Sequence, residues 1–212
     1  MRVCVVTSHT PEIMVVAKKT AINKSIYCLR HGYNLNIFSG RLSVRHPSWD
    51  KIAMVRNLLP LFDWCVWMDS DCIFNNFAKK LEDRLSGDAV FVRDFASDDT
   101  NRDKQLINAG VFGIRNCKDS MDFLESVWDE GSDSHSTIDK RSYVGWPWEQ
   151  SALCKHILNH KNFSILDDMD MNCHPSIATP ETHVIHYMGW RATQEAEDAA
   201  IADIDRRNLV LL

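Results

Sequence analysis

An apolar run at residues 64–68 ends directly in Asp69-Ser70-Asp71, and this pairing limits the possible folds more than any other feature of the chain. Five consecutive apolar residues indicate a strand that is buried on both faces of a sheet. Because residues i and i+2 of an extended chain point to the same side, Asp69 and Asp71 direct two carboxylates to one place. Open α/β sheets bind ligands at this edge, and converging carboxylates favour a divalent cation.

Strand and helix patterns alternate along most of the 212 residues. Residues 3–7 and 35–38 predict strands, and the intervening helix is expected to begin at Pro11 and to end at Gly32. This βαβ arrangement favours a parallel sheet. Further strands are expected at 89–93, 107–114 and 182–187, and further helices at 49–59, 77–85 and 194–207, with two others beginning near 119 and 147. The predicted fold is α/β: a Rossmann-like, mostly parallel central sheet flanked by helices, in a single domain over residues 1–212.

Charge and cysteine content exclude several classes of protein. A net charge of −5 argues against a nucleic-acid partner. Seven cysteines without a CxxC pair favour free thiols in a reducing compartment. The sequence has no apolar stretch long enough for a signal peptide or a membrane span, so we expect a cytoplasmic protein without a span. The apolar end at residues 209–212 is typical of one module of a longer polypeptide.

Two histidines in the predicted strand at 182–187 offer a third metal ligand. His183 and His186 are followed by Tyr187-Met188-Gly189-Trp190-Arg191. A histidine at the end of a strand can complete a site begun by two aspartates, and mixed carboxylate and imidazole ligands suit Mn²⁺ better than Ca²⁺ or Mg²⁺. A histidine in a strand is otherwise a structural residue with satisfied hydrogen bonds.

Two further segments each contain a side-chain amide, Asn108 in one and Gln150 in the other. Asn108 lies two residues before Gly110 in a predicted strand, where a glycine permits close approach of a hydroxyl-rich ligand or forms a β-bulge. Glu149 and Gln150 open a predicted helix. Glu149 is either a carboxylate favoured by the helix dipole or, together with Gln150, part of a cleft.

The order of these motifs resembles one known family. It comprises the βαβ unit, the DSD after a buried strand, an N-x-G-x-F strand followed by Arg115-Asn116-Cys117, a helix opening E-Q-S-A-L, and a late His-x-x-Gly. Together they are similar to the GT-A-fold glycosyltransferases, and most closely to the plant xyloglucan xylosyltransferases and the fungal α-galactosyl- and α-mannosyltransferases. The short form also resembles glycosyltransferase domains of multidomain chlorovirus proteins, which would place the chain in the host cytoplasm.

The resemblance implies a role for each matching residue. It assigns nucleotide binding to about residues 1–75, and donor and acceptor binding to about residues 76–212. The implied metal ligands are Asp69, Asp71 and His186. The implied contacts to the nucleotide sugar are Thr7, Ser8, Lys51, Asp69, Ser70, Asn108, Gly110, Gly189 and Arg191, and the implied catalytic residues are Gln150, Glu149 and Asp94. The family has two acidic residues before the glutamine, whereas this chain has Trp148 and Glu149.

The implied function is metal-dependent transfer of a hexose-type sugar from a UDP-sugar to a hydroxyl of an oligosaccharide acceptor. Mn²⁺ is the expected cofactor, with Mg²⁺ as a substitute, and the UDP-sugar is the expected donor. The resemblance favours retention of configuration, whereas Glu149 acting as a general base would permit inversion.

Two other functions fit parts of the sequence. A haloacid-dehalogenase-type phosphatase also has an apolar strand before a DxD, and Asp167-Asp168 resembles its late acidic pair. That family, however, has Thr or Val where this chain has Ile73, and its DxD follows the first strand. A carbohydrate-binding module with a degenerate site is the non-enzymatic alternative, and the intact DxD and His186 argue against it.

Overall fold

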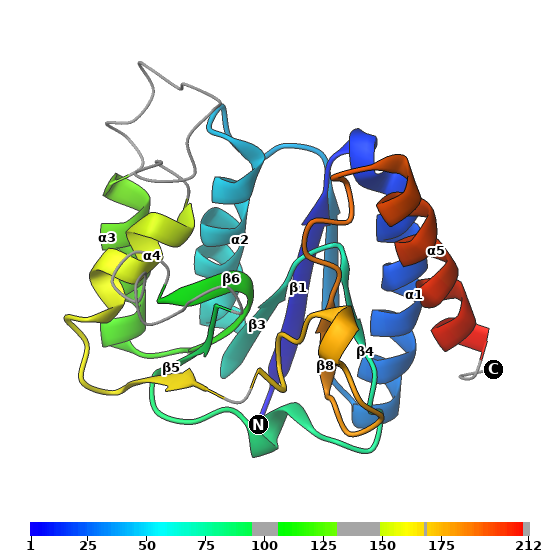
Figure 1. Cartoon of the computed structure of the whole chain (residues 1–212). Coiled ribbons are helices and arrows are strands. Elements are labelled where there is room, and N and C mark those ends of the chain that lie inside the picture. Colours follow the sequence, from blue (N-terminus) through cyan, green and yellow to red (C-terminus); the bar gives the residue numbers. More distant parts are fainter. Residues whose placement is uncertain (95–105, 131–148, 168, 210–212) are drawn as a thin grey trace.

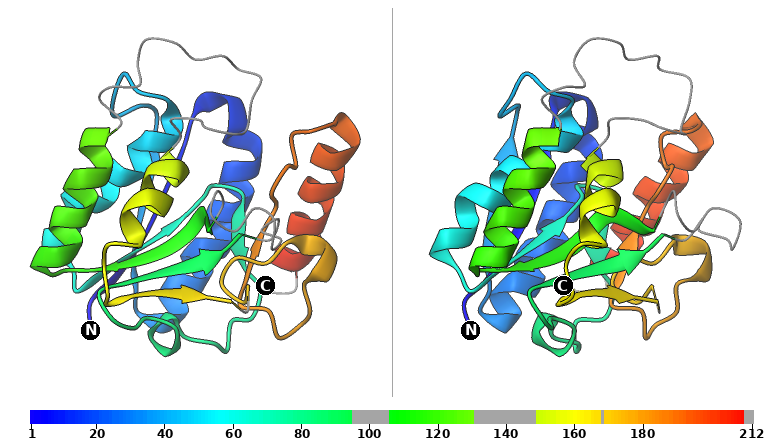
Figure 2. Two further views of the ribbon diagram at one scale, coloured as in Figure 1. Left: turned by 60° about the vertical axis from the view of Figure 1, so that its left-hand side comes forward. Right: turned by 90° about the vertical axis from the view of Figure 1, so that its left-hand side faces the viewer.

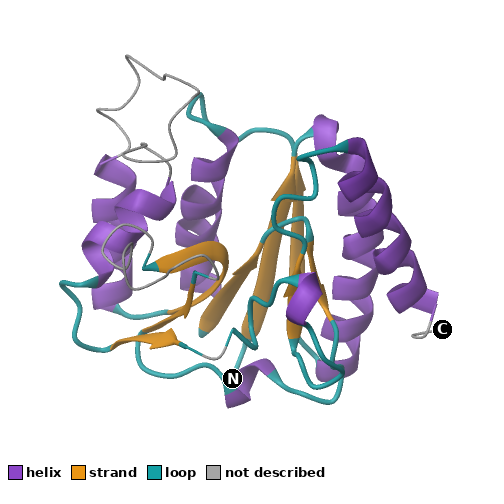
Figure 3. Cartoon of the chain, in the orientation of Figure 1, coloured by secondary structure: helices purple, strands orange, loops and turns teal. Residues whose placement is uncertain are grey.

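The computed structural model describes residues 1–94, 106–130, 149–167 and 169–209. The strands are β1 (Val3–His9), β2 (Asn34–Ser39), β3 (Trp64–Met68), β4 (Cys72–Phe74), β5 (Ala89–Arg93), β6 (Ile107–Arg115), β7 (Phe163–Leu166) and β8 (Val184–His186). The helices are α1 (Met14–His31), α2 (Asp50–Leu58), α3 (Lys118–Glu130), α4 (Glu149–Ile157) and α5 (Gln194–Leu209). Figures 1 and 3 show these elements as a central sheet between groups of helices.

The central sheet is mixed, with most strands parallel. Its strand order is β2-β1-β3-β6-β5-β7. β1 pairs in parallel with β2 and β3, and β5 pairs in parallel with β7. β6 is antiparallel to both of its neighbours. The short strands β4 and β8 form a separate antiparallel sheet. The predicted fold class, a mostly parallel sheet flanked by helices in one domain, is confirmed.

Both faces of the sheet are covered. Helices α2, α3 and α4 lie on one face, while α1 and α5 lie on the other, as the two turned views in Figure 2 show. All five residues of β3 are buried, as expected for an interior strand. Cys65 and Trp67 pack toward α2 and α3, and Val66 and Met68 pack toward α1. Full burial of one such side chain contributes roughly 1.5–3 kcal/mol, so β3 is a stable support for the residues that follow it.

Strand directions bring distant segments to the end of β3. Because β6 runs antiparallel to β3, its first half lies beside the C-terminal end of β3, where Asp69 N donates a hydrogen bond of 2.8 Å to Gly110 O. β8 pairs with β4 in a register that sets His186 opposite Cys72, the residue after Asp71. Two pairings therefore converge on the segment that contains both aspartates.

Three elements differ from the predictions. The expected helix at 77–85 is wrong: this segment contains a single 3-10 turn, Leu81–Asp83. Its apolar residues Phe77, Leu81 and Leu85 recur with helical spacing, yet they pack inward from an irregular loop against the α1 side of the core. β4 and β7 are not expected from the sequence, because strands of three and four residues carry almost no periodic signal.

No helix within the described residues is both long and apolar enough to span a membrane.

Candidate active site

Helix α1 holds the loop that carries the two aspartates. Lys24 Nζ donates to Asp69 O at 3.1 Å, and Thr20 Oγ1 donates to Ser70 O. Asn23 makes two hydrogen bonds with the backbone of Phe74, of 2.9 and 2.7 Å. All three side chains are fully buried in the middle of the helix. These hydrogen bonds from α1 thus fix the backbone that carries Asp69 and Asp71.

His186 reaches the aspartates from the small sheet. Its Nε2 lies 3.3 Å from Asp71 Oδ1 and 4.0 Å from Asp69 Oδ2. The imidazole packs directly over Gly110, where a Cβ would meet His186 Cε1 at 2.2 Å. The glycine predicted from the sequence therefore makes room for this histidine, since any larger residue would collide with the ring.

These residues fit a divalent cation. Metal–ligand bonds of about 2.1 Å place ligand atoms about 3 to 4 Å apart around one ion, and the distances from His186 to both carboxylates lie in this range. Cys72 Sγ also lies within 4.8 Å of ligand atoms of Asp71 and His186. Burial raises the pKa of the Cys72 thiol well above its usual value, and the thiol is directed at Gly110 O, 3.8 Å away. Asp71 and His186 are therefore the closest pair of ligand groups, and Asp69 Oδ2, 4.0 Å from His186 Nε2, lies outside the group of three that Asp71, Cys72 and His186 form.

The two carboxylates have opposite electrostatic environments. Burial raises the pKa of Asp69, although Lys51 opposes this effect. Burial would also raise the pKa of Asp71, but the neighbouring His186 outweighs it and lowers that pKa. For His186 the same two carboxylates outweigh burial and raise the pKa of the imidazole. A positively charged group between the two aspartates is therefore strongly favoured.

A buried ion-pair network lies on the other side of Asp69. Lys51 Nζ is 3.1 Å from Asp69 Oδ1 and 2.8 Å from Glu149 Oε1, and it donates to Ala109 O at 3.0 Å. Trp67 Nε1 donates to Asp69 Oδ1 at 2.7 Å. Burial would lower the pKa of Lys51, but Asp69 and Glu149 outweigh it and raise that pKa. Lys51 therefore remains protonated and compensates two carboxylates.

Gln150 and Asp94 lie beside the start of β6. Gln150 Oε1 accepts a hydrogen bond of 2.9 Å from Ala109 N, and its Nε2 donates to Asp94 Oδ2 at 3.4 Å. The Gln150 amide is thereby held in one orientation, next to Asn108.

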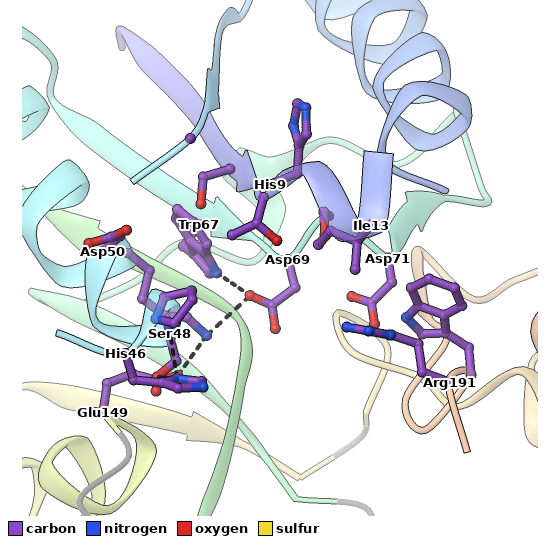
Figure 4. A pocket seen from close by; sticks show the side chains of 17 residues that line it. His9, Ile13, His46, Ser48, Asp50, Trp67, Asp69, Asp71, Glu149 and Arg191 are labelled. Carbon is purple, nitrogen blue, oxygen red and sulfur yellow. Dashed lines mark hydrogen bonds and ion pairs between the residues drawn. The ribbon is translucent and has the colours of Figure 1, made fainter. Parts of the chain in front are cut away.

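A cleft of about 500 Å³ opens above the acidic pair. Figure 4 shows Glu149 and His46 on the Asp69 side of the cleft and Arg191 on the Asp71 side. The residues that line it are Ser8, His9, Thr10, Ile13, Gly40, His46, Pro47, Ser48, Asp50, Lys51, Trp67, Asp69, Ser70, Asp71, Glu149, Trp190 and Arg191. Its volume is within the range of sites for small ligands.

Half of the fourteen site residues predicted from the sequence line this cleft. These seven are Ser8, Lys51, Asp69, Ser70, Asp71, Glu149 and Arg191. Gly110 and His186 are joined to the acidic pair by the contacts described above, whereas Thr7 and Gly189 only precede lining residues in the chain. Asp167, considered as part of a late acidic pair, is three-quarters exposed and pairs with Arg93; Asp168 and Trp148 lie outside the described residues.

Two supporting residues are not marked by the sequence. Lys24 carries no signal, because a lysine in a helix is ordinarily solvated. Asn172 is in a loop without periodicity, yet it is buried and lies 2.8 Å from His186 Nδ1.

Comparisons with known proteins find sequences similar to parts of this chain. Residues 3–93 match the galactosyl transferase GMA12/MNN10 family. A probable xyloglucan 6-xylosyltransferase 1 of Oryza sativa subsp. indica is 32% identical over 117 residues, which are 51% of this chain and 25% of the relative. A galactomannan galactosyltransferase 1 of Cyamopsis tetragonoloba is 33% identical over 115 residues, 50% of this chain and 26% of the relative. The chain thus aligns with about a quarter of the length of these curated relatives.

Solved structures resemble the whole chain. A glycosyltransferase involved in glycosylation of the major capsid of PBCV-1 superimposes with a TM-score of 0.71 at 18% identity, over 97% of this chain and 100% of that one. The galactosyltransferase LgtC, in complex with donor and acceptor sugar analogues, gives 0.60 at 9% identity, over 96% and 94% of the two chains. The GT-A glycosyltransferase fold and the resemblance inferred from the motifs are both confirmed.

Proposed function

We propose that this chain is a metal-dependent glycosyltransferase that moves a hexose-type sugar from a UDP-sugar to a hydroxyl of a glycan acceptor. The observation that carries the proposal is the approach of His186 to Asp71 and Asp69, two carboxylates that line a cleft in a GT-A fold. The similarity to a xylosyltransferase and a galactosyltransferase supports sugar transfer as the reaction.

The roles of the residues follow from their positions. Asp69, Asp71 and His186 would hold Mn²⁺, with Mg²⁺ as a substitute. The cation supplies positive charge to the diphosphate as it leaves the sugar. Arg191, at the rim on the Asp71 side, provides a second positive group for the same diphosphate. Lys51 favours the ionised form of Asp69 and holds it through an ion pair of 3.1 Å.

The environment of Glu149 favours retention of configuration. Its side chain is only 5% exposed and is tied to Lys51 at 2.8 Å. A general base that activates the acceptor must reach the acceptor hydroxyl and accept its proton. A carboxylate whose pKa is lowered by Lys51, despite burial, is a weak base. Gln150, held by Ala109 N and Asp94, would instead be the amide close to the reacting carbon of the donor sugar.

The experiment is a panel of UDP-sugars, namely UDP-glucose, UDP-galactose, UDP-xylose and UDP-rhamnose, in which UDP release is measured with and without Mn²⁺. We expect release from one donor, dependent on metal, and reduced on the order of 10²–10³-fold in Asp71→Ala. Asp122→Ala is the matched control, because Asp122 is exposed on α3 and pairs only with Lys118 among the described residues.

Other outcomes separate the alternatives. Equal UDP release without metal, or an unchanged rate in Asp71→Ala, would contradict the proposed metal site. Mg²⁺-dependent hydrolysis of a simple phosphate ester such as p-nitrophenyl phosphate, with no UDP release, indicates a phosphatase. Metal-dependent binding of UDP without turnover of any donor indicates a binding module.

A further inference from the structure

Asn172 lies between Asn108, at the start of β6, and His186, at the end of β8, and it is almost completely buried. Its Nδ2 donates to Asn108 Oδ1 at 2.9 Å. Its Oδ1 lies 2.8 Å from His186 Nδ1, on the side of the imidazole away from the aspartates. Asn172 therefore connects a residue at the start of β6 with the histidine at the end of β8.

The backbone N–H of Gly110 determines the orientation of two side-chain amides, those of Asn108 and Asn172. The N–H of Gly110 can only donate, and it meets Asn108 at 2.9 Å, so the Asn108 atom at this position is the oxygen. The same oxygen receives a second bond, so Asn172 must direct its NH₂ group toward it. The remaining Asn172 atom, the carbonyl oxygen, then faces His186 Nδ1.

An oxygen that only accepts requires a proton on the facing nitrogen. The neutral His186 ring therefore carries its proton on Nδ1 and leaves the lone pair on Nε2, which lies 3.3 Å from Asp71 and 4.0 Å from Asp69. This is the tautomer that a metal ligand needs, because coordination uses an unprotonated nitrogen.

We propose that Asn172 is a positioning residue that fixes the Nδ1–H tautomer of His186, through a chain that begins at the Gly110 N–H. The inference rests on the proposed metal site. Without Asn172, the neutral ring is free to place its proton on Nε2 and to donate it to Asp71 Oδ1, 3.3 Å away. That hydrogen bond would compete with the cation for both groups.

The test combines the spectrum of the histidine with metal affinity. Two-bond ¹H–¹⁵N NMR spectra of the imidazoles, recorded without metal at a pH where the ring is neutral, report which nitrogen carries the proton. His186→Gln assigns the signal. We expect Nδ1–H in the wild type and in Asn172→Asp, which keeps an acceptor for Nδ1–H. We expect Nε2–H to gain population in Asn172→Leu, and the Kd for Mn²⁺, measured by EPR, to rise about 10–100-fold.

Asn76→Leu is the matched control. The Asn76 side chain makes two hydrogen bonds, to Pro180 O at 3.2 Å and from Ala78 N at 3.0 Å, and neither involves the site. We expect it to leave both the His186 spectrum and the Kd unchanged. If Asn172→Leu does not fold, Asn172→Ser makes the same test, because its hydroxyl is too short to reach both partners.

The two proposals fail differently. A wild-type protein that binds no Mn²⁺ but shows the Nδ1–H ring, lost in Asn172→Leu, refutes the metal site and supports the tautomer control. A wild-type ring protonated at Nε2, or a spectrum and Kd that Asn172→Leu leaves unchanged, overturns the role of Asn172.

Discussion

The two sides of the candidate metal site are stabilised by different chemistry. On the side of Asp69 the neighbours are charged: Lys51 pairs with both Asp69 and Glu149 inside the protein. On the side of His186 that faces away from the aspartates, the support comes from neutral groups: an amide, Asn172, and a glycine that only leaves space. Since buried carboxylates need compensating charge whereas an imidazole needs a defined tautomer, each side requires a different kind of support.

The largest effect is expected from removing charge on the Asp69 side. Lys51→Met leaves the buried Glu149 and the partly exposed Asp69 without their cation, and breaking a buried pair such as Lys51–Glu149 costs about 3–5 kcal/mol. The free energy of unfolding, measured in urea, should fall by this amount. Lys155→Met is the control: Lys155 pairs with Glu130 at the surface and is 67% exposed, so we expect a change below about 0.5 kcal/mol. Similar losses in both variants would mean that the buried network contributes no special stability.

The opposite experiment adds charge beside β8 by lowering the pH, at a histidine whose backbone N–H donates to Asp170 Oδ1 and which lies near the Lys79–Asp170 ion pair. His183, just before β8, is fully buried, and burial lowers its pKa to about 4. Tyr27 Oη donates to Lys79 O, so His183 Nε2–H donates to Tyr27, and His183 Nδ1 has no partner among the described residues. The unfolded chain binds a proton at this residue below pH 6.5, and the folded chain does so only near pH 4. The stability associated with a neutral His183 is therefore fully present above pH 6.5. As the pH falls toward 4 it is lost, and the free energy of unfolding decreases by about 3 kcal/mol in total.

The check is the difference between wild type and His183→Gln in unfolding free energy, measured from pH 7.5 to 4. Glutamine can still donate to Tyr27 but does not titrate in this range. We expect the wild type to lose stability relative to the variant as the pH falls. Parallel curves would show that the His186 side tolerates a buried charge, and the contrast between the two sides would then disappear.

The sequence predicts the parts of the fold that depend on periodicity. β3 and the aspartates after it follow from one apolar run, and β5 is expected with its observed bounds, Ala89–Arg93. The helix expected at 77–85 is wrong because inward-facing apolar residues of an irregular loop have the same spacing as one face of a helix. Strand pairings such as β4 with β8 are non-local, and no pattern within either segment specifies its partner.

The candidate site is predictable where a motif marks it and not where only packing does. Asp69, Asp71 and His186 can be grouped from their motifs and their order along the chain. Lys24 and Asn172 act through single hydrogen bonds to Asp69 O and His186 Nδ1, and such contacts depend on which segments meet in space. The role expected for Gly110 is contact with a ligand, whereas the structure gives it contact with His186.

The smallest effect is expected from the second buried lysine, Lys24. Unlike Lys51, it has no carboxylate at ion-pair distance among the described residues, and its Nζ contacts Asp69 O and Thr20 Oγ1 only. Burial lowers its pKa to about 8, so the folded protein bears a desolvation cost for this charge at pH 7. Lys24→Met removes that cost together with one hydrogen bond to a buried carbonyl, so the free energy of unfolding should stay within about 1 kcal/mol of the wild type.

The pH dependence of the unfolding free energy of Lys24→Met, relative to the wild type, shows whether the charge on Lys24 stabilises or destabilises the folded protein. Between pH 8 and 10.5 the unfolded chain still holds a proton on Lys24 that the folded chain has released. The wild type should therefore gain stability relative to Lys24→Met as the pH rises through this range, as urea unfolding at a series of pH values can measure. A loss in Lys24→Met at pH 7 as large as that in Lys51→Met would mean that any buried cation next to Asp69 is required, whether or not it is paired. In that case the ion pairs of Lys51 would no longer explain the difference between the two sides.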